Sequence, residues 1–136
     1  MTRCTSGDGF HVVDRWDDVF DALRTEPRRQ LVDALMDVSI DEAVPLPDAA
    51  INPNLAVDRK QLLIQLRHRH LPLLSDARFV RWDDEPLRAF RGPRFDQVAI
   101  VFECLSENAD RIPDELVDAY QILEQEREQE REQSSV

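Results

Sequence analysis

The chain has 136 residues, of which 42% are hydrophobic and 33% are charged. This length suits one domain with an extension and is short for an elaborate catalytic cleft. The sequence contains no run of about 18 apolar residues that would span a bilayer, and its first residues lack the apolar stretch of a signal peptide. We therefore expect a cytoplasmic protein with no membrane partner.

The charge is strongly acidic, with 17 Lys and Arg against 28 Asp and Glu and a net charge of −11. Lys60 is the only lysine, so nearly all of the positive charge is arginine. Carboxylates hold water and cations at molar salt, and this composition indicates a halophilic source, with an ordinary acidic adaptor protein as the alternative. Residues 57–94 differ from the rest because they carry nine basic and five acidic side chains. Positive charge is thus concentrated in one segment.

The first part of the chain predicts two helices. Residues 1–13 are interpreted as a flexible tail, and a helix follows over 14–24 with Asp14 as its N-cap. Its apolar residues recur with helical spacing and are expected to face the core: Trp16, Val19, Phe20 and Leu23. Pro27 suits the first turn of a second helix over 27–37. The apolar stripe of this second helix consists of Leu31, Val32, Leu35 and Met36.

A short third helix is predicted to begin at Ser39. Glu42 lies three residues later, which is the spacing of a capping box. Pro45 and Pro47 would end this helix soon afterwards, because proline cannot donate a backbone hydrogen bond. Residues 45–54 are then expected to form a loop.

The fourth helix is predicted to begin near Val57, and its residues separate into two arcs on a helical wheel. The apolar arc contains Leu62, Leu63, Leu66, His70, Leu73 and Ala77. Gln61, Gln65 and His68 lie on the opposite arc. Pro72 predicts a kink or a break near residues 68–71, because a proline inside a helix removes one hydrogen bond and clashes with the preceding turn.

The polar arc of this helix has the side chains of a DNA-reading surface. Glutamines such as Gln61 and Gln65 can form paired hydrogen bonds with adenine, and His68 lies beside them. The flanking basic residues are suited to phosphate contacts: Arg59, Lys60, Arg67 and Arg69.

A β-ribbon is predicted after the fourth helix. Residues 79–82 alternate as in a strand, residues 83–86 have turn chemistry, and residues 87–91 form the returning strand. Arg88 and Arg91 on this ribbon are expected to approach a phosphate or the minor groove. A solvated ribbon edge without DNA contacts is the alternative.

Three segments together resemble the winged-helix domains abundant in haloarchaea, which are distantly similar to arsenic-repressor-type transcriptional regulators. The segments are WDDVFDALRTEPRRQLVDAL at 16–35, SIDEA at 39–43 and LRHRHLPLLSDARFVRWD at 66–83. The resemblance implies that the helix with Gln61, Gln65, His68 and Arg69 is the recognition helix and that a positioning helix begins at Ser39.

The chain departs from this pattern at two places. Arg78 stands where these domains usually have the glycine of Asp-Ala-Gly, the residue best suited to a left-handed helix cap. The predicted wing turn also lacks glycine and carries Asp83, Asp84 and Glu85, which a phosphate backbone would repel. The sequence therefore leaves open whether the wing touches DNA.

The C-terminal part predicts two further helices and a charged end. One strongly apolar helix, which either closes the core or meets a partner, contains Phe95, Val98, Ala99, Val101, Phe102 and Leu105. Pro113 opens the last helix, which is predicted to continue through about Leu123. Residues 93–124 are expected to mediate a homodimer, and residues 125–136 form a charged low-complexity tail.

Other chemistry is not indicated by the sequence. It contains neither a glycine-rich phosphate loop nor an HExxH or CxxC pattern. The soft metal ligands lack a recognisable spacing: Cys4, His11, His68, His70 and Cys104. We therefore expect no enzymatic activity, no cofactor and no metal site, and interpret His70 as a core histidine because it lies in the apolar arc.

The sequence as a whole predicts a mostly α fold with a small β-ribbon, in which a winged helix-turn-helix over residues 14–92 precedes the C-terminal helices. The predicted function is a DNA-binding transcriptional regulator that acts on double-stranded DNA as a dimer. The alternative is a winged-helix protein-protein interaction module that does not bind DNA.

Overall fold

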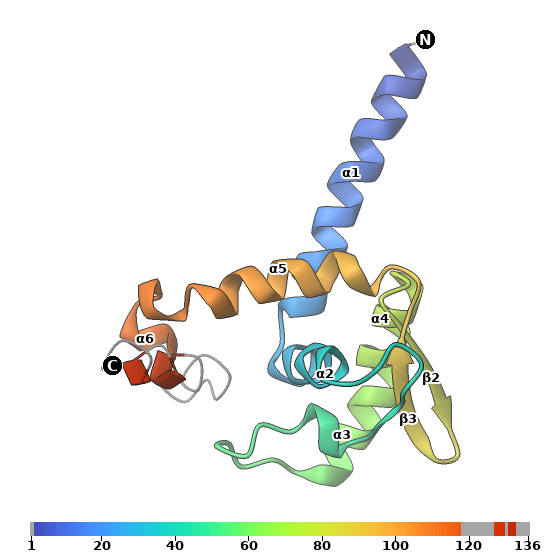
Figure 1. The fold of residues 1–136 in the computed structure, drawn as a ribbon. Coiled ribbons are helices and arrows are strands. Elements are labelled where there is room, and N and C mark those ends of the chain that lie inside the picture. Colours follow the sequence, from blue (N-terminus) through green and yellow to red (C-terminus); the bar gives the residue numbers. More distant parts are fainter. Residues whose placement is uncertain (1, 118–126, 130, 133–136) are drawn as a thin grey trace.

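The computed structural model describes residues 2–117, 127–129 and 131–132, and it shows a mostly helical chain with a small three-stranded antiparallel sheet (Figure 1). The helices of three or more turns are α1 (Thr2–Leu23), α2 (Glu26–Met36) and α5 (Phe95–Glu107). The strands are β1 (Val44–Pro45), β2 (Val80–Asp84) and β3 (Leu87–Arg91), in the spatial order β1-β3-β2. This arrangement is compatible with a winged-helix-like layout.

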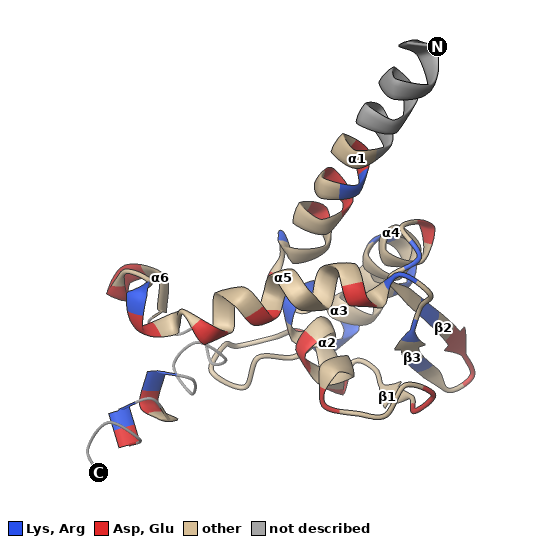
Figure 2. Cartoon of the chain, turned by 45° about the horizontal axis from the view of Figure 1, so that its top comes forward, with Lys and Arg blue, Asp and Glu red and all other residues tan. Residues whose placement is uncertain are grey.

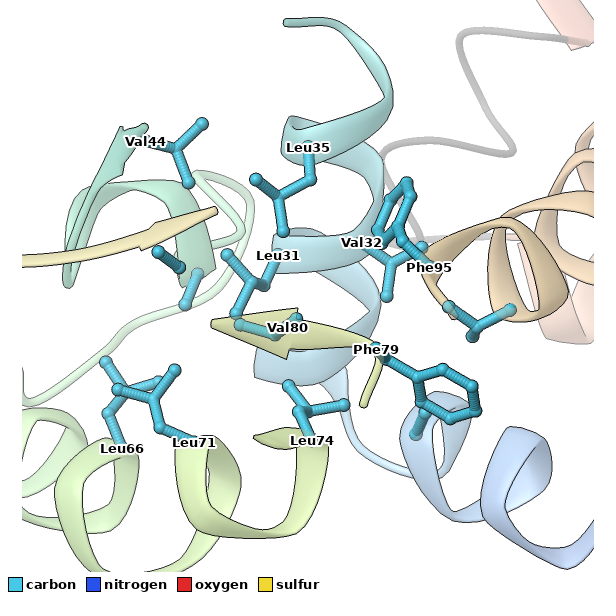
Figure 3. Close-up of a cluster of buried hydrophobic side chains, with 14 of the residues drawn as sticks. Leu31, Val32, Leu35, Val44, Leu66, Leu71, Leu74, Phe79, Val80 and Phe95 are labelled. Atoms are coloured by element: carbon cyan, nitrogen blue, oxygen red, sulfur yellow. The ribbon is translucent and has the colours of Figure 1, made fainter. Parts of the chain in front are cut away.

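One core joins α2, the sheet and the segment between them. Leu31, Val32 and Leu35 of α2 are fully buried and lie at its centre (Figure 3). Around them the close-up shows side chains from the other elements: Val44, Leu66, Leu71, Leu74, Phe79, Val80 and Phe95. Thr25 is the N-cap of α2, without a side-chain hydrogen bond, and Pro27 lies in the first turn as predicted. α1, α2 and α5 all contact one another, so the first helix and the helix that follows the sheet pack together around this core.

The β-ribbon forms where the sequence predicts it. β2 pairs with β3 from Val80 opposite Arg91 to Asp84 opposite Leu87. Val80, Leu87 and Ala89 are buried, whereas Arg81 and Arg88 are exposed, so one face of the ribbon packs on the core.

The helix predicted from Ser39 is wrong. The contacts of a capping box are partly present, because the Ser39 backbone N–H lies 3.5 Å from a Glu42 carboxylate oxygen. The chain nevertheless forms only turns before Val44, which pairs with Ala89 of β3 in an antiparallel bridge. Extended backbone at Val44 is incompatible with a continuing helix, so sheet pairing overrides the local signal. A single 3-10 turn, η1 (Asp48–Ala50), follows in place of the predicted positioning helix.

α1 also differs from its prediction. It begins at Thr2 rather than Asp14, so the segment interpreted as a tail is helical from Thr2 onward, and Figure 1 shows this part projecting away from the rest of the chain. No proline interrupts residues 2–13, and Asp14 lies inside the helix instead of capping it. Val19 and Leu23 are buried as predicted, but Trp16 is 51% and Phe20 61% exposed.

The predicted fourth helix consists of three consecutive pieces: α3 (Arg59–Gln65), the π-helical turn η2 (Leu66–His70) and α4 (Leu71–Asp76). The Leu71 N–H donates to the Leu66 carbonyl, five residues earlier, so the helix is widened just before Pro72. This irregularity lies where Pro72 predicts one, because the wider turn separates the proline ring from the preceding carbonyls.

Beyond α5, the described part of the chain contains the 3-10 turn η3 (Ala109–Arg111) and α6 (Asp114–Val117), and residues 127–129 and 131–132 are helical. The predicted continuation of the last helix to Leu123 lies outside the described residues. Arg127 contacts this region, with its guanidinium donating to the Ala109 carbonyl at 3.1 Å. Within the described ranges, none of the helices has the length and hydrophobicity needed to cross a bilayer.

Candidate nucleic-acid interface

The helix from Arg59 to His70 has one buried and one exposed face. Leu62, Leu66 and His70 are at most 4% exposed and attach it to the core. The residues predicted to meet DNA lie on the exposed side: Arg59, Lys60, Gln61, Gln65, Arg67, His68 and Arg69. Both glutamines and the neighbouring cations are thus presented to solvent on a helix that the core holds in place.

Asp58 determines where this helix begins. Its carboxylate accepts hydrogen bonds from the backbone N–H groups of Lys60 at 3.1 Å and Gln61 at 3.3 Å. A side-chain acceptor at the N-cap satisfies backbone donors that have no partner within the helix. Asp58 therefore orients the first turn, which carries Lys60 and Gln61.

A buried polar contact holds the other end of the helix. Arg28 of α2 is 1% exposed and its Nε–H donates to Nδ1 of His70 at 2.9 Å. The same guanidinium donates to the Asp21 carbonyl of α1. Burial, with further effects from the positive charges of Arg28 and Arg69, lowers the pKa of His70 to about 4. His70 is therefore neutral and accepts through Nδ1, which agrees with its interpretation as a core histidine.

The β2–β3 hairpin contacts the exposed helix face through the ion pair between Arg67 and Asp84. Arg67 donates from Nε to Asp84 at 3.0 Å, and both side chains are roughly half exposed. At the hairpin tip Arg88 pairs with Asp83 at 3.2 Å. Figure 2 shows the acidic tip of the hairpin next to the basic residues of its strands. Asp83 and Asp84 of the hairpin are thus paired with arginines of the same chain.

A third predicted phosphate contact is also paired. Arg59 lies 2.8 Å from a carboxylate oxygen of Asp48 in η1, with both side chains mostly exposed. Exposed ion pairs contribute only about 0–1 kcal/mol, so a phosphate can replace the carboxylate at little cost. Lys60 and Arg69 remain the exposed cations of the helix that no such ion pair engages among the described residues.

The structure corrects the predicted role of Arg91. Its guanidinium donates to the carbonyls of Leu35 at 2.9 Å and Val38 at 2.8 Å, and it lies over the ring of Phe95. Because the last carbonyls of a helix have no partner within it, Arg91 satisfies the C-terminal end of α2. A half-buried side chain in this position acts within the fold and is not a phosphate contact.

Two features of the helix and its contacts are not evident from the sequence. Ile64 is 53% exposed between the two glutamines, although its neighbours Leu62 and Leu63 turn inward. Arg28 is buried although it lies in a run of charged residues, and no pattern in a single sequence distinguishes it from Arg29. Both follow from how α2 and the helix pack together.

The described residues contain no group of three or more His, Cys, Asp or Glu side chains that could hold a metal ion. Comparison of the chain with protein-family models, with curated proteins and with solved structures gave no match.

Proposed function

We propose that the protein is a DNA-binding transcriptional regulator with a winged-helix-like layout, in which the 3-10 turn η1 stands in place of a positioning helix and the helix from Arg59 to His70 enters the major groove. The observation that carries this proposal is the exposed face with Gln61 and Gln65 on a helix whose opposite face is buried beside a β-hairpin. An α-helix fits the major groove, and glutamine pairs with the adenine edge there.

The surrounding cations then have different roles. Lys60 and Arg69 hold phosphates beside the bases that Gln61, Gln65 and His68 read. Arg59, Arg67 and Arg88 contact phosphate only when it replaces their carboxylate partners.

The regulator acts as a homodimer in which the C-terminal helices take part. Two-fold symmetry places two recognition helices about 34 Å apart, which is one turn of DNA. The acidic composition suits a halophile, since binding at molar salt gains less from counterion release and depends more on base contacts.

A protein-protein interaction module is the second candidate function. The observation in its favour is that Arg59, Arg67 and Arg88 are already paired with carboxylates, while the apolar Ile64 is exposed at the centre of the helix. In this alternative the helix face binds another protein, and duplex DNA is not bound.

Selection of bound sequences from a random duplex pool at about 1–2 M KCl separates the two functions, since high salt suppresses non-specific binding. A regulator enriches a motif with two-fold symmetry. Absence of enrichment from a protein shown to be folded by circular dichroism would favour the interaction module.

Variants test the assigned helix. Gln65→Ala is expected to relax the base preference at one position of the motif, and Arg69→Ala to weaken binding to all sequences and reduce the salt slope by about 1. Arg131→Ala removes the same charge from an exposed site in the C-terminal segment and serves as the control. Equal binding by Arg69→Ala and Arg131→Ala would refute the helix assignment.

A further inference from the structure

An apolar surface is exposed along α1, α5 and α6, away from the candidate nucleic-acid interface. We call it the α1–α5 face and define it by six side chains, each at least 46% exposed: Val12, Trp16, Phe20, Ile100, Leu105 and Leu116. Trp16 and Phe20 have the helical spacing of core residues, yet nothing in the described chain covers them. Large exposed apolar patches of this kind mark interaction sites.

The α1–α5 face consists of a ridge beside two grooves. Trp16 and Phe20 form the ridge, since their rings stack with centroids 5.9 Å apart. Trp16 borders a groove of about 320 Å³ whose other wall is Ile100 and Val101 of α5. Phe20 borders a larger groove of about 760 Å³ whose other wall includes Leu105 and Leu116. Each aromatic residue of the ridge therefore stands next to a hollow lined by apolar side chains.

We propose that the α1–α5 face binds a second copy of this chain, with the Trp16–Phe20 ridge of each copy in a groove of the other. A two-fold interface uses the same patch on both subunits, so it requires protrusions and hollows on one surface. The α1–α5 face has both. The proposal deepens the proposed function, because it specifies which surface forms the dimer, and it makes α1 as important for pairing as the C-terminal helices.

The Trp16–Phe20 ridge supplies only part of the contact area that a stable dimer requires. A full aromatic side chain buries about 150–250 Å², so the half-exposed Trp16 and Phe20 supply roughly 200 Å² per chain. A stable interface needs about 800 Å² from each partner, which the ridge alone does not provide. The helix α1 has 22 residues, and its N-terminal part projects beyond the rest of the chain (Figure 1). In the proposed dimer, α1 and the rest of the α1–α5 face provide the remaining contact area.

The charges around the face are complementary between two copies. Carboxylates gather on α1, where burial, reinforced by Asp14, Asp21 and Asp17, raises the pKa of Asp18. The lining of both grooves is mostly apolar. Its charged members are Arg15 in the smaller groove and Arg24, Arg29 and Arg111, together with Asp21, in the larger one. Insertion of one ridge into the groove of another copy brings carboxylates of one chain toward arginines of the other. Salt weakens these local attractions, but exposed ion pairs contribute only about 0–1 kcal/mol each. The repulsion between two chains of net charge −11 is the larger effect, so screening should strengthen the dimer.

Sedimentation equilibrium of the full chain tests the proposal. Because no DNA is present, the result does not depend on the proposed DNA binding. The expected result is a particle of two 15.8 kDa chains whose dissociation constant falls as KCl is raised toward about 2 M. Phe20→Glu and Trp16→Glu should each raise the dissociation constant at least about 30-fold, as truncation of a central interface residue does. Ile40→Glu changes a side chain that is 65% exposed outside the face, and the dimer should tolerate it.

A monomer at all concentrations would overturn the proposal, as would a dimer that both ridge variants leave unchanged. Trp16 fluorescence supplies a measurement that needs no disruptive variant. In a Trp82→Phe background Trp16 is the only tryptophan, and its emission should shift to the blue as protein concentration increases. An emission maximum that stays constant while the mass doubles would show that the dimer forms through another surface.

Discussion

The buried contact between Arg28 and His70 predicts that stability falls at mildly acidic pH. His70 is 4% exposed and accepts the Arg28 Nε–H at 2.9 Å. Protonation of Nδ1 would remove the acceptor and place two cations in contact, with Arg69 as a further positive charge nearby. A protonated imidazole is therefore incompatible with this part of the core.

The size of the effect follows from the two pKa values. The pKa of His70 is about 4 in the folded chain and about 6.5 in the unfolded chain. Between pH 4 and pH 6.5 the unfolded chain binds more protons at His70 than the folded chain does. The stability that neutral His70 contributes is therefore fully present above about pH 6.5 and declines as the pH is lowered. The loss amounts to about 2 kcal/mol at pH 5 and about 3 kcal/mol at pH 4 and below.

Urea unfolding at pH 7.5 and at pH 5, in the same concentration of KCl, measures this loss. His70→Asn is the matched control, because its amide oxygen can accept the Arg28 hydrogen bond but does not titrate in this range. Carboxylates contribute equally to both proteins, so the difference between their pH dependences isolates His70. The reasoning would be refuted if wild type and His70→Asn lost the same free energy of unfolding between the two pH values.

Three further predictions concern the end of α4 and the hairpin. Arg78 has φ of 66° in a helix-ending turn, where the Phe79 N–H donates to the Leu74 carbonyl. Because glycine adopts this left-handed conformation without strain, Arg78→Gly should raise the free energy of unfolding by roughly 0.5–1 kcal/mol. A free energy of unfolding below that of the wild type would contradict this. Gly92→Ala should lower the free energy of unfolding by about 3 kcal/mol, because the added Cβ would lie 2.5 Å from the Arg78 carbonyl oxygen. An unchanged midpoint of urea unfolding would show that the backbone shifts to make room for the Cβ. Asp84→Asn should tighten DNA binding up to about fivefold, because it releases Arg67 from its ion pair. Asp110→Asn makes the same charge change on η3 and should not tighten binding. Equal effects of the two variants in a binding titration would show that the gain comes from net charge alone.

Local patterns in the sequence predict much of the described fold. The apolar spacing of α2, the returning strands of the hairpin and the irregular helix before Pro72 are all present where expected. The left-handed conformation that the winged-helix resemblance implies at Arg78 is also observed. These features depend on residues within a few positions of one another, which is the range over which helical and strand periodicity operate.

The candidate site is only partly predictable. The exposed positions of Gln61, Gln65 and His68 follow from the helical wheel. The wheel cannot show that Arg91 caps α2 or that Asp84 pairs with Arg67, because these partners are distant along the chain. The sequence therefore identified the helix face but not which of its cations are already engaged.

The sequence by itself determined which residues are apolar, which are charged and where helices and strands are favoured. Only the tertiary structure decided what each apolar stripe covers. Val19 packs inside, whereas Trp16 and Phe20, on the same helix and with the same spacing, face outward as a stacked pair. Periodicity records that a helix has an apolar side, but the partner of that side is chosen by packing between segments far apart in the chain or, as we propose here, between two chains.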